Sequence, residues 1–205
     1  MTLLNLTPDE LLSTTRSVRK RLDFERPVER ELLEQCVDLA FQAPSGGDAQ
    51  SWHFVLVTDP GRKRLLSDLY RRSKAENDPS TVSPDKQRTM DSSSYLAEHL
   101  QEVPVLVIPC IEGRVEDASF MVQAVTWGSI LPAAWSFMLA ARARGLGTAW
   151  TSLHLAYERE AADVVGIPYE RVMQTALIPV AHSIGTDFKP GPRGPRDERV
   201  HWDRW

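Results

Sequence analysis

The sequence predicts a layered domain of alternating helices and strands, of the α/β or the α+β class. Segments whose apolar residues recur at helical spacing alternate along the chain with short apolar runs of strand length. The chain has 205 residues, which is the size of one domain, and it contains no internal repeat. Its 42% hydrophobic and 25% charged residues are typical of a soluble domain that buries a core.

The N-terminal part is predicted to form two helices. Thr7 suits an N-cap, Pro8 suits the first helical position and Glu10 completes a capping box, so a short helix follows to about residue 14. A second helix is predicted over residues 28–42, where apolar residues recur every three or four positions. A proline and two glycines then stop this helix.

Two strands and a helix are predicted in the middle of the chain. Residues 52–58 combine aromatic and β-branched side chains, and residues 103–110 are almost entirely apolar, as expected for a strand covered on both faces. Between them, Asp59 begins a helix that ends near residue 73. Residues 73–94 are polar and rich in Ser, Asp and Pro, so we expect a mobile excursion that acts as a lid or substrate loop.

Residues 119–141 carry no charge over the length that a membrane-spanning helix needs. The segment contains polar residues and a proline, and the chain has no second segment of this kind, so a buried helix is favoured over a membrane span. After it, strands are predicted at residues 148–152 and 172–180, with a helix at residues 158–165 between them.

Charge and cysteine content exclude several classes of partner and site. The net charge is −4 and the pI is near 5.8, so composition gives no case for nucleic acid or an anionic membrane as the main partner. Cys36 and Cys110 lie far apart without a CxxC motif, so neither a disulfide scaffold nor a zinc site is expected. The N-terminal residues lack the features of a signal peptide, which predicts a cytoplasmic location.

Two motifs contain residues suited to an anionic or flat ligand. Residues 16–19 (Arg-Ser-Val-Arg) place two guanidinium groups beside a hydroxyl group, which suits a phosphate, although a solvated basic turn is the alternative. The loop at residues 43–52 leads into a strand. Its glycines allow close approach to a flat ligand, and Ser45, Asp48 and Gln50 offer short polar groups, with an ordinary turn as the alternative.

Two further motifs are less specific. Residues 145–150 (Gly-Leu-Gly-Thr-Ala-Trp) follow a helix, so they lack the context of a dinucleotide fingerprint. The polar tail ends with Trp202 and Trp205, whose apolar area favours packing, for instance on another subunit, and this would bring Arg193 to a fixed place. The sequence lacks motifs for serine, metal or Walker-type nucleotide chemistry, so no metal is expected.

Taken in order, these motifs resemble those of the nitroreductase-like family of FMN-dependent oxidoreductases. The shared features are the N-terminal Arg-Ser-x-Arg, the Ala-Pro-Ser…Gln-x-Trp-x-Phe entry to a strand, the Leu-Ala-Ala-x-x-x-Gly-Leu-Gly helix end and a C-terminal Arg-x-Pro. They lie in the family's order and roughly its spacing, and the match extends from about Leu11 to Trp205.

The resemblance implies an α+β fold in which helices flank a central mixed β-sheet. It also implies an intertwined homodimer with two FMN sites at the subunit interface. Residues 1–205 then form a single FMN-binding domain, with a C-terminal extension at about 186–205 that packs on the partner subunit. Such a dimer would cover the uncharged segment at residues 119–141, which a monomer of this size has little means to bury.

By the same resemblance, residues near the two ends of the chain hold the flavin phosphate and the N1/O2 edge of the ring. Arg16, Ser17 and Arg19 look like the N-terminal part of this site, and Arg193 looks like the C-terminal phosphate-binding Arg. A cation at N1/O2 favours the negative charge of the reduced flavin. Many relatives have an Arg at the position of Thr15, so the role of Arg16 depends on its direction.

Two other segments complete the site that the resemblance implies. A loop from the other subunit lies against the flavin, and the family's backbone faces N5 after the strand predicted near residue 148. No catalytic residue beyond the flavin itself is implied. The positions in these two segments are Pro44, Ser45, Gly46, Asp48 and Gln50 in the loop, and Thr151, Ser152 and Leu153 near N5.

Two departures from the family pattern concern charge. Asp48 stands where an Asn is common, and a carboxylate there would disfavour reduced flavin unless it caps the loop. Gly191 stands where many relatives have a cation.

The implied activity is that of an FMN-dependent oxidoreductase with a ping-pong mechanism. NADH or NADPH reduces FMN by hydride transfer to N5 and leaves, and an electron-poor acceptor such as a nitroaromatic, a quinone or an enone takes its place. One alternative is a flavin-binding dimer that serves as a sensor or store without turnover. Another is a family member with a different flavin reaction, such as reductive dehalogenation.

Overall fold

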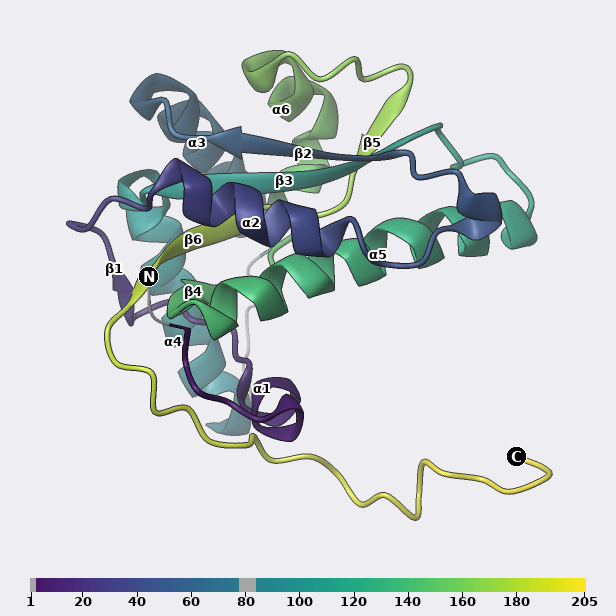
Figure 1. Cartoon of the computed structure of the whole chain (residues 1–205). Coiled ribbons are helices and arrows are strands. Elements are labelled where there is room, and N and C mark those ends of the chain that lie inside the picture. Colours follow the sequence, from purple (N-terminus) through teal and green to yellow (C-terminus); the bar gives the residue numbers. More distant parts are fainter. Residues whose placement is uncertain (1–2, 78–83) are drawn as a thin grey trace.

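The computed structural model describes residues 3–77 and 84–205, which form a layered α+β domain (Figure 1). A six-stranded sheet has the order β1-β6-β3-β2, with β4 paired to β6 and β5 to β3. The helices are α1 (Pro8–Thr14), α2 (Arg30–Ala40), α3 (Pro60–Glu76), α4 (Pro84–His99), α5 (Phe120–Ala143) and α6 (Glu158–Val165). The strands are β1 (Leu22–Asp23), β2 (Trp52–Val57), β3 (Val105–Glu112), β4 (Leu146–Thr148), β5 (Val172–Gln174) and β6 (Ile178–Ser183).

Strand β3 lies inside the sheet and is buried on both faces, as its apolar sequence predicts. Successive side chains of a strand point to opposite faces. Accordingly, Val105 and Val107 belong to the core cluster that includes residues of α2 and α5, whereas Leu106 and Ile108 belong to the cluster that includes residues of α3, α4 and α6. The helices therefore form a layer on each side of the sheet (Figure 1).

The strand ladders are antiparallel, and a parallel bridge between Ser17 and Thr148 gives the sheet its mixed character. This agrees with the predicted α+β class. The strand predicted at residues 172–180 is two strands, because Leu177 leaves the β3 ladder and pairs with Thr151. The strand predicted at residues 148–152 lies earlier in the chain, as β4 (Leu146–Thr148), and shares only Thr148 with the predicted range.

The predicted polar excursion at residues 73–94 is largely helical in its described parts. Helix α3 continues to Glu76, and α4 begins at Pro84. Tertiary packing explains the difference, since Leu96 and Leu100 in and after α4 are fully buried against the sheet. Residues 78–83 of the predicted excursion lie outside the described residues.

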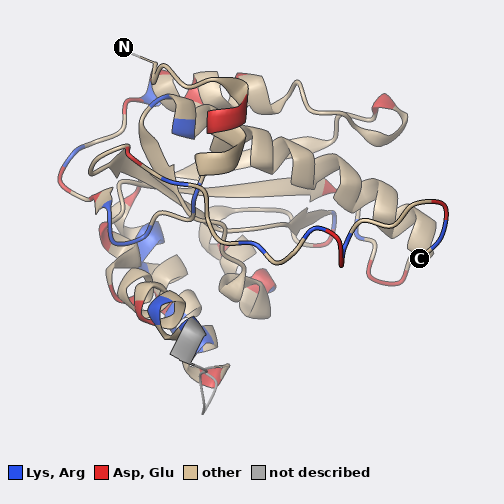
Figure 2. Cartoon of the chain, turned by 90° about the horizontal axis from the view of Figure 1, so that it is seen from below, with Lys and Arg blue, Asp and Glu red and all other residues tan. Residues whose placement is uncertain are grey.

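Helix α5 is the uncharged segment found in the sequence, and its one charged residue is Arg142, near its end (Figure 2). It is long and apolar enough to cross a membrane by length and composition, but 44% of its most apolar window is buried inside the chain. Its N-terminal half is mostly exposed. Exposed apolar residues on one side of α5 form two pairs with a spacing of four positions, Met121 with Val125 and Leu131 with Trp135.

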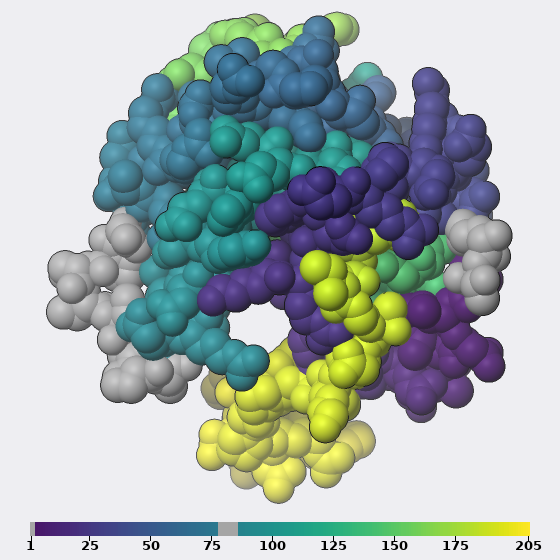
Figure 3. Space-filling model, turned by 90° about the vertical axis from the view of Figure 1, so that its left-hand side faces the viewer, coloured from purple at the N-terminus to yellow at the C-terminus, as the bar shows by residue number. Residues whose placement is uncertain are grey.

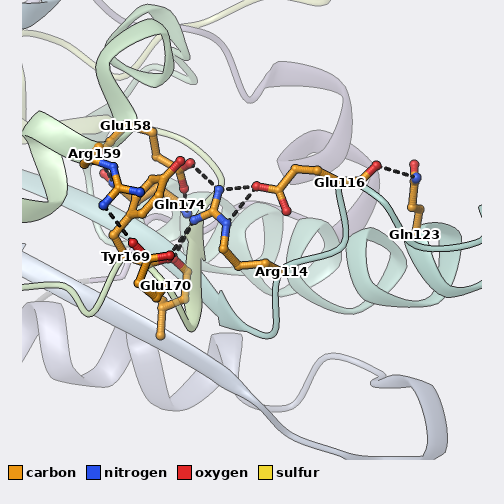
Figure 4. A network of polar contacts seen from close by, with 9 residues as sticks. Arg114, Glu116, Gln123, Glu158, Arg159, Tyr169, Glu170 and Gln174 are labelled. Carbon is orange, nitrogen blue, oxygen red and sulfur yellow. Dashed lines mark hydrogen bonds and ion pairs between the residues drawn. The ribbon is translucent and has the colours of Figure 1, made fainter.

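An ion-pair network joins the segment after β3 to α6 and β5 (Figure 4). Arg114 donates to Tyr169 O and to Glu158 Oε2, both at 2.8 Å, and it also pairs with Glu116. Glu158 Oε1 in turn accepts from Gln174 N at 2.8 Å. The network fixes the end of the sheet that faces away from residues 16–19.

The C-terminal tail leaves the sheet after β6 and runs below the domain without helix or strand (Figure 1). Its start is fixed by Arg16, whose Nε and Nη2 donate to Lys189 O at 3.1 and 2.8 Å. Trp202 is 84% exposed and Trp205 is fully exposed. Packing of this tail on a partner subunit therefore stays a prediction.

His154 lies in the 3₁₀ turn Leu153–Tyr157 and is fully buried, without a hydrogen-bond partner among the described residues. Burial lowers the pKa of His154 to about 4. The unfolded chain therefore takes up this proton at a higher pH than the folded chain, and acidification from about pH 6.5 toward 4 should lower the free energy of unfolding. Urea denaturation should show a loss of about 2 kcal/mol from this group between about pH 7.5 and 5.0.

The matched variant for this prediction is His154→Met. It places an apolar side chain in the buried site, and this side chain cannot be protonated. Exposed groups with shifted pKa values, such as Glu29 and Asp187, are the same in both proteins. The difference in slope therefore isolates His154. Equal pH dependence in the two proteins would contradict the prediction.

Candidate active site

The Arg-Ser-Val-Arg segment lies along the end of β4. Val18 N donates to Thr148 O at 2.7 Å, and a Cβ at Gly147 would come within 2.9 Å of Val18 Cγ1. The lack of a side chain at Gly147 thus permits this close packing. Val18 is buried while Arg16 and Arg19 are half-buried, so both guanidinium groups project from an anchored backbone. Ser17 is exposed beside them.

A pocket of about 320 Å³ opens next to Arg19. Residues after β4 form one side of it, including the predicted Thr151, Ser152 and Leu153. Helices α3 and α4 form the other sides. The remaining lining residues are Tyr70, Lys74, Asn77, Met90, Ser93 and Trp150.

Arg19 is a half-buried cation in this pocket that forms no ion pair with a carboxylate among the described residues. Its side-chain hydrogen bond goes to Ser92 Oγ, at a long 3.4 Å. Burial holds the pKa of the Arg19 guanidinium below its usual value, and nearby Tyr70 acts in the opposite direction. Burial also raises the pKa of Tyr70, so its hydroxyl stays neutral. An anion bound beside Arg19 would offset the cost of burying this charge.

Two further cations, Arg16 and Arg193, lie close together near the start of the tail. A Cβ at Gly191 would lie 2.9 Å from Arg193 Nη1 and 3.0 Å from Arg16 Nη2. The hydrogen bonds of both guanidinium groups go to backbone carbonyl oxygens, among them Lys189 O and Pro192 O. Two adjacent cations without a carboxylate between them suit a phosphate dianion.

The surface is hollowed in this region between α4, the N-terminal segment and the C-terminal tail (Figure 3). Segments from both ends of the chain border this hollow (Figure 3). One chain thus brings Arg19 to the residues after β4, and separately brings Arg16 to Arg193.

The glycine loop lies elsewhere, against the N-terminal half of α5. Gly46 N donates to Ser129 Oγ at 2.9 Å, and a Cβ at Gly46 would lie 2.2 Å from Val125 Cγ1. Only glycine permits this approach. Since residues 16–19 lie beside β4, beyond the C-terminal end of α5, the chain does not bring Gly46 to Arg19 (Figure 1).

The polar residues of this loop are held in an uncommon backbone conformation. Asp48 and Gln50 have φ values of 54° and 48°, which non-glycine residues seldom adopt. Gln50 Nε2 donates to Asp48 Oδ1 at 2.7 Å, and Gln50 N donates to Ser45 Oγ at 3.1 Å. Asp48 thus holds the loop through Gln50. Pro44, Asp48 and Gln50 are exposed, so the loop is free to meet another molecule.

Sequence analysis missed the residues that α3 and α4 contribute to the pocket. Tyr70, Lys74 and Asn77 are spaced four and three positions apart, as are residues on one face of a helix. This spacing was the available signal. The sequence pattern does not reveal this face, because residues 73–94 are polar and rich in Ser, Asp and Pro, which predicts a loop.

Another cavity, of about 650 Å³, lies next to α6, on the same face of the sheet as the pocket beside Arg19. It is lined by parts of β2, β3 and the segment after α6, including His53, Cys110 and Glu112. Burial raises the pKa of Cys110 to about 12, so its thiol is unreactive. None of the predicted site residues lines this cavity, and no metal-binding cluster of His, Cys, Asp or Glu occurs among the described residues.

Comparison with known proteins decides the family. The family model described as "Nitroreductase family" matches residues 12–182, which include the residues after β4 and the Arg-Ser-Val-Arg segment. The chain belongs to the nitroreductase family. The resemblance carried by the sequence motifs is thereby confirmed.

Relatives of this nitroreductase-family protein are named for different reactions. It is 30% identical over 150 residues to 5,6-dimethylbenzimidazole synthase of Rhodospirillum rubrum, covering 71% of this chain and 68% of the relative. Its fold is similar to that of iodotyrosine deiodinase bound to FMN and 3-iodo-L-tyrosine, with a TM-score of 0.71, 24% identity and coverage of 95% and 97%.

A third protein with a similar fold is described as a nitroreductase. The fold is similar to that of an FMN and NADPH-dependent nitroreductase from Sphigopyxis sp. strain HMH, with a TM-score of 0.69, 20% identity and coverage of 98% of this chain and all of the other. Family membership of this nitroreductase-family protein therefore establishes its fold, whereas its reaction depends on the site.

Proposed function

We propose that the protein is an FMN-dependent, NAD(P)H-linked oxidoreductase of electron-poor acceptors that acts as a homodimer. The observation that carries this proposal is two groups of cations, Arg19 in one and Arg16 with Arg193 in the other, that pair with no carboxylate among the described residues. They suit the two negative regions of reduced FMN, which are the N1/O2 edge and the phosphate. Of the proteins with a similar fold, the iodotyrosine deiodinase is bound to FMN and the nitroreductase is described as FMN-dependent.

The homodimer is proposed from two surfaces that one chain leaves uncovered. The glycine loop presents Asp48 and Gln50 away from its own pocket, and the apolar stripe of α5 next to it is exposed. A second copy packed on α5 would cover the stripe and bring its glycine loop to the pocket of the first copy. Pro44, Ser45 and Gly46 would then lie against the flavin.

In this proposal the residues of the chain bind and orient, and none acts as an acid or base. Bound FMN supplies the two-electron chemistry, accepting reducing equivalents from NADH or NADPH and passing them to the acceptor. Arg19 stabilises the added negative charge, Arg16 and Arg193 hold the phosphate, and the backbone after Thr148 lines the reacting edge. The predicted cytoplasmic location stays a prediction.

The test is the visible spectrum of the purified protein followed by anaerobic addition of NADH or NADPH. Yellow protein whose flavin is bleached by either nucleotide, and regains its colour when a nitroaromatic or quinone is added, supports the reductase. A flavin that both nucleotides leave oxidised would favour the sensor or store instead. The exposed carboxylate of Asp48 keeps that second function open, since it disfavours reduced flavin nearby.

Replacing Arg19 by Gln should lower the two-electron reduction potential of the bound flavin. Loss of one charge-assisted hydrogen bond to the reduced form corresponds to a decrease of about 30–60 mV. The measurement is a dye-equilibrated reductive titration. Arg19→Lys should restore part of the potential, whereas Lys20→Gln, which removes a neighbouring exposed charge, should leave it unchanged. An unaltered potential in Arg19→Gln would show that another donor faces N1/O2.

A further inference from the structure

Phe188, near the start of the C-terminal tail, lies between two guanidinium groups of the domain. The central carbon of the Arg21 guanidinium is 4.5 Å from the centre of the Phe188 ring, and that of Arg142 is 4.9 Å from it. Cations at such distances from an aromatic ring are attracted to it. The half-buried ring also packs against the core cluster that contains Val18 and Leu22. Phe188 is therefore held to the domain by both charge and apolar contact.

Arg142 is a buried cation that needs this aromatic ring. It is only 4% exposed, its Nε has no hydrogen-bond partner, and no carboxylate pairs with it among the described residues. Its Nη2 donates to Thr186 O at 2.8 Å. Burial lowers the pKa of the Arg142 guanidinium, and the nearby Arg21 acts in the same direction. Because burying a charge without a partner is costly, the face of the Phe188 ring compensates for part of this cost.

Arg21 holds the same turn of the tail from the other side. Its Nε donates to Ile184 O at 2.6 Å, and its Nη2 pairs with Asp187 Oδ1 at 2.6 Å. Gly185 has a φ of 74°, which glycine adopts readily, and this conformation turns the chain back toward Arg21. The turn therefore places the Phe188 ring between the two arginines.

Beyond Phe188, the tail has little hold on the domain. Arg16 donates to Lys189 O, whereas the hydrogen bonds of residues 190–205 with described residues stay within the tail. Arg193 follows Phe188 by five positions, which an extended chain spans in about 17 Å. The place of Arg193 beside Arg16 therefore depends on the two attachments that come just before it.

We propose that Phe188 is a positioning residue for the phosphate of FMN, because its ring anchors the tail so that Arg193 stays beside Arg16. This inference rests on the proposed function, which assigns these two arginines to the phosphate. Two guanidinium groups repel each other, so an unanchored tail would carry Arg193 away from Arg16 before an anion binds. An anchored tail has lost this freedom before FMN arrives, which lowers the entropic cost of binding.

The experiment titrates the flavin-free full-length protein with FMN and, separately, with riboflavin, which lacks the phosphate. Flavin fluorescence gives both dissociation constants. Phe188→Ala should weaken FMN binding about tenfold, as expected from loss of the cation–π contacts and of the ordered tail. Its riboflavin affinity should equal that of the wild type, which also shows that the variant is folded. Phe188→Tyr keeps the ring and should bind FMN like the wild type.

A double-mutant cycle separates positioning from a general effect on the fold. In an Arg193→Ala background, Phe188→Ala should weaken FMN binding by at most about twofold, because the arginine through which Phe188 acts is missing. A residue that only stabilised the fold would weaken FMN binding by the same factor in both backgrounds.

Ile184→Ala is the matched control. It removes an apolar side chain that is 58% exposed in the same turn, and it leaves the backbone oxygen that Arg21 binds. Both flavins should bind to this variant as they do to the wild type.

Three results would overturn the inference: wild-type FMN affinity in Phe188→Ala, a loss of affinity that extends to riboflavin, or an equal loss in the Arg193→Ala background. If the wild type binds FMN and NADPH reduces it, the proposed function stands even when the inference fails. A wild type that binds no flavin would overturn both.

Discussion

Replacing Leu131 by Glu is expected to convert the proposed dimer into a monomer that does not retain FMN. Leu131 lies in the exposed apolar stripe of α5, which runs from Met121 to Trp135. Fourteen residues of helix span about 21 Å. An exposed apolar stripe of this length is typical of a surface that another protein covers. A carboxylate within the covered stripe would have to be buried without a partner, which is unfavourable.

The loss of FMN follows from the position of the glycine loop. Gly46 packs on Val125 of α5, away from Arg19 of the same chain, so in the proposed dimer the loop would reach the pocket of the other copy. Disrupting the contact between copies should therefore remove one side of both flavin sites at once. The change is expected to be all-or-none at micromolar protein, which makes it the largest of the effects predicted for this protein.

Light scattering and the visible spectrum measure this outcome. The wild type should have twice the chain mass of 23.1 kDa and carry flavin, and Leu131→Glu should have the single mass and be colourless. Leu65→Glu is the control, since Leu65 is 52% exposed on α3, against 40% for Leu131. A yellow Leu131→Glu dimer would show that α5 is not the interface.

Replacing Arg193 by Ala is expected to weaken FMN binding by about 1.5–3 kcal/mol, which is about 10- to 150-fold in the dissociation constant. The guanidinium groups of Arg193 and Arg16 meet at Gly191, and their hydrogen bonds go to backbone carbonyls. Removing one of them leaves the phosphate dianion with one cation at this place. Arg16→Ala should have a similar effect and also release the tail at Lys189.

Fluorescence titration of the apoprotein with FMN, compared with riboflavin, measures this effect. Riboflavin lacks the phosphate, so its affinity should be the same for Arg193→Ala and the wild type. Arg204→Ala removes an equal charge from the far end of the tail and should bind both ligands normally. An FMN dissociation constant that is the same in Arg193→Ala and the wild type would contradict the assignment of Arg193 to the phosphate.

Local chemistry in the sequence was sufficient to predict several elements. The capping box of Thr7 and Glu10 is formed at the start of α1, and α6 occupies the predicted residues 158–165. The apolar run of β3 predicted a strand buried on both faces. In each case the deciding interactions lie within one turn or one strand, so sequence pattern alone carries them.

Elements whose ends depend on distant partners could not be predicted in the same way. β1 (Leu22–Asp23) has two residues and exists because it pairs with His182 and Ser183. The break between β5 and β6 arises because Leu177 pairs with Thr151. Most of helix α4 is polar in sequence, which predicts a loop. The segment is helical because Leu96 and Ala97 near its end pack into the core.

For the site, the sequence by itself determined the family, because its short motifs lie in the family's order along the chain. It also singled out the cationic residues that we propose hold FMN. Only the tertiary structure decided which of these residues meet. It joined Arg16 to Arg193 at Gly191 across more than 170 positions and left Gly46 at the far end of α5. It also added Lys74 to the pocket. The physical reason is that a pocket is formed by packed surfaces, and packing depends on contacts between segments that are distant in sequence.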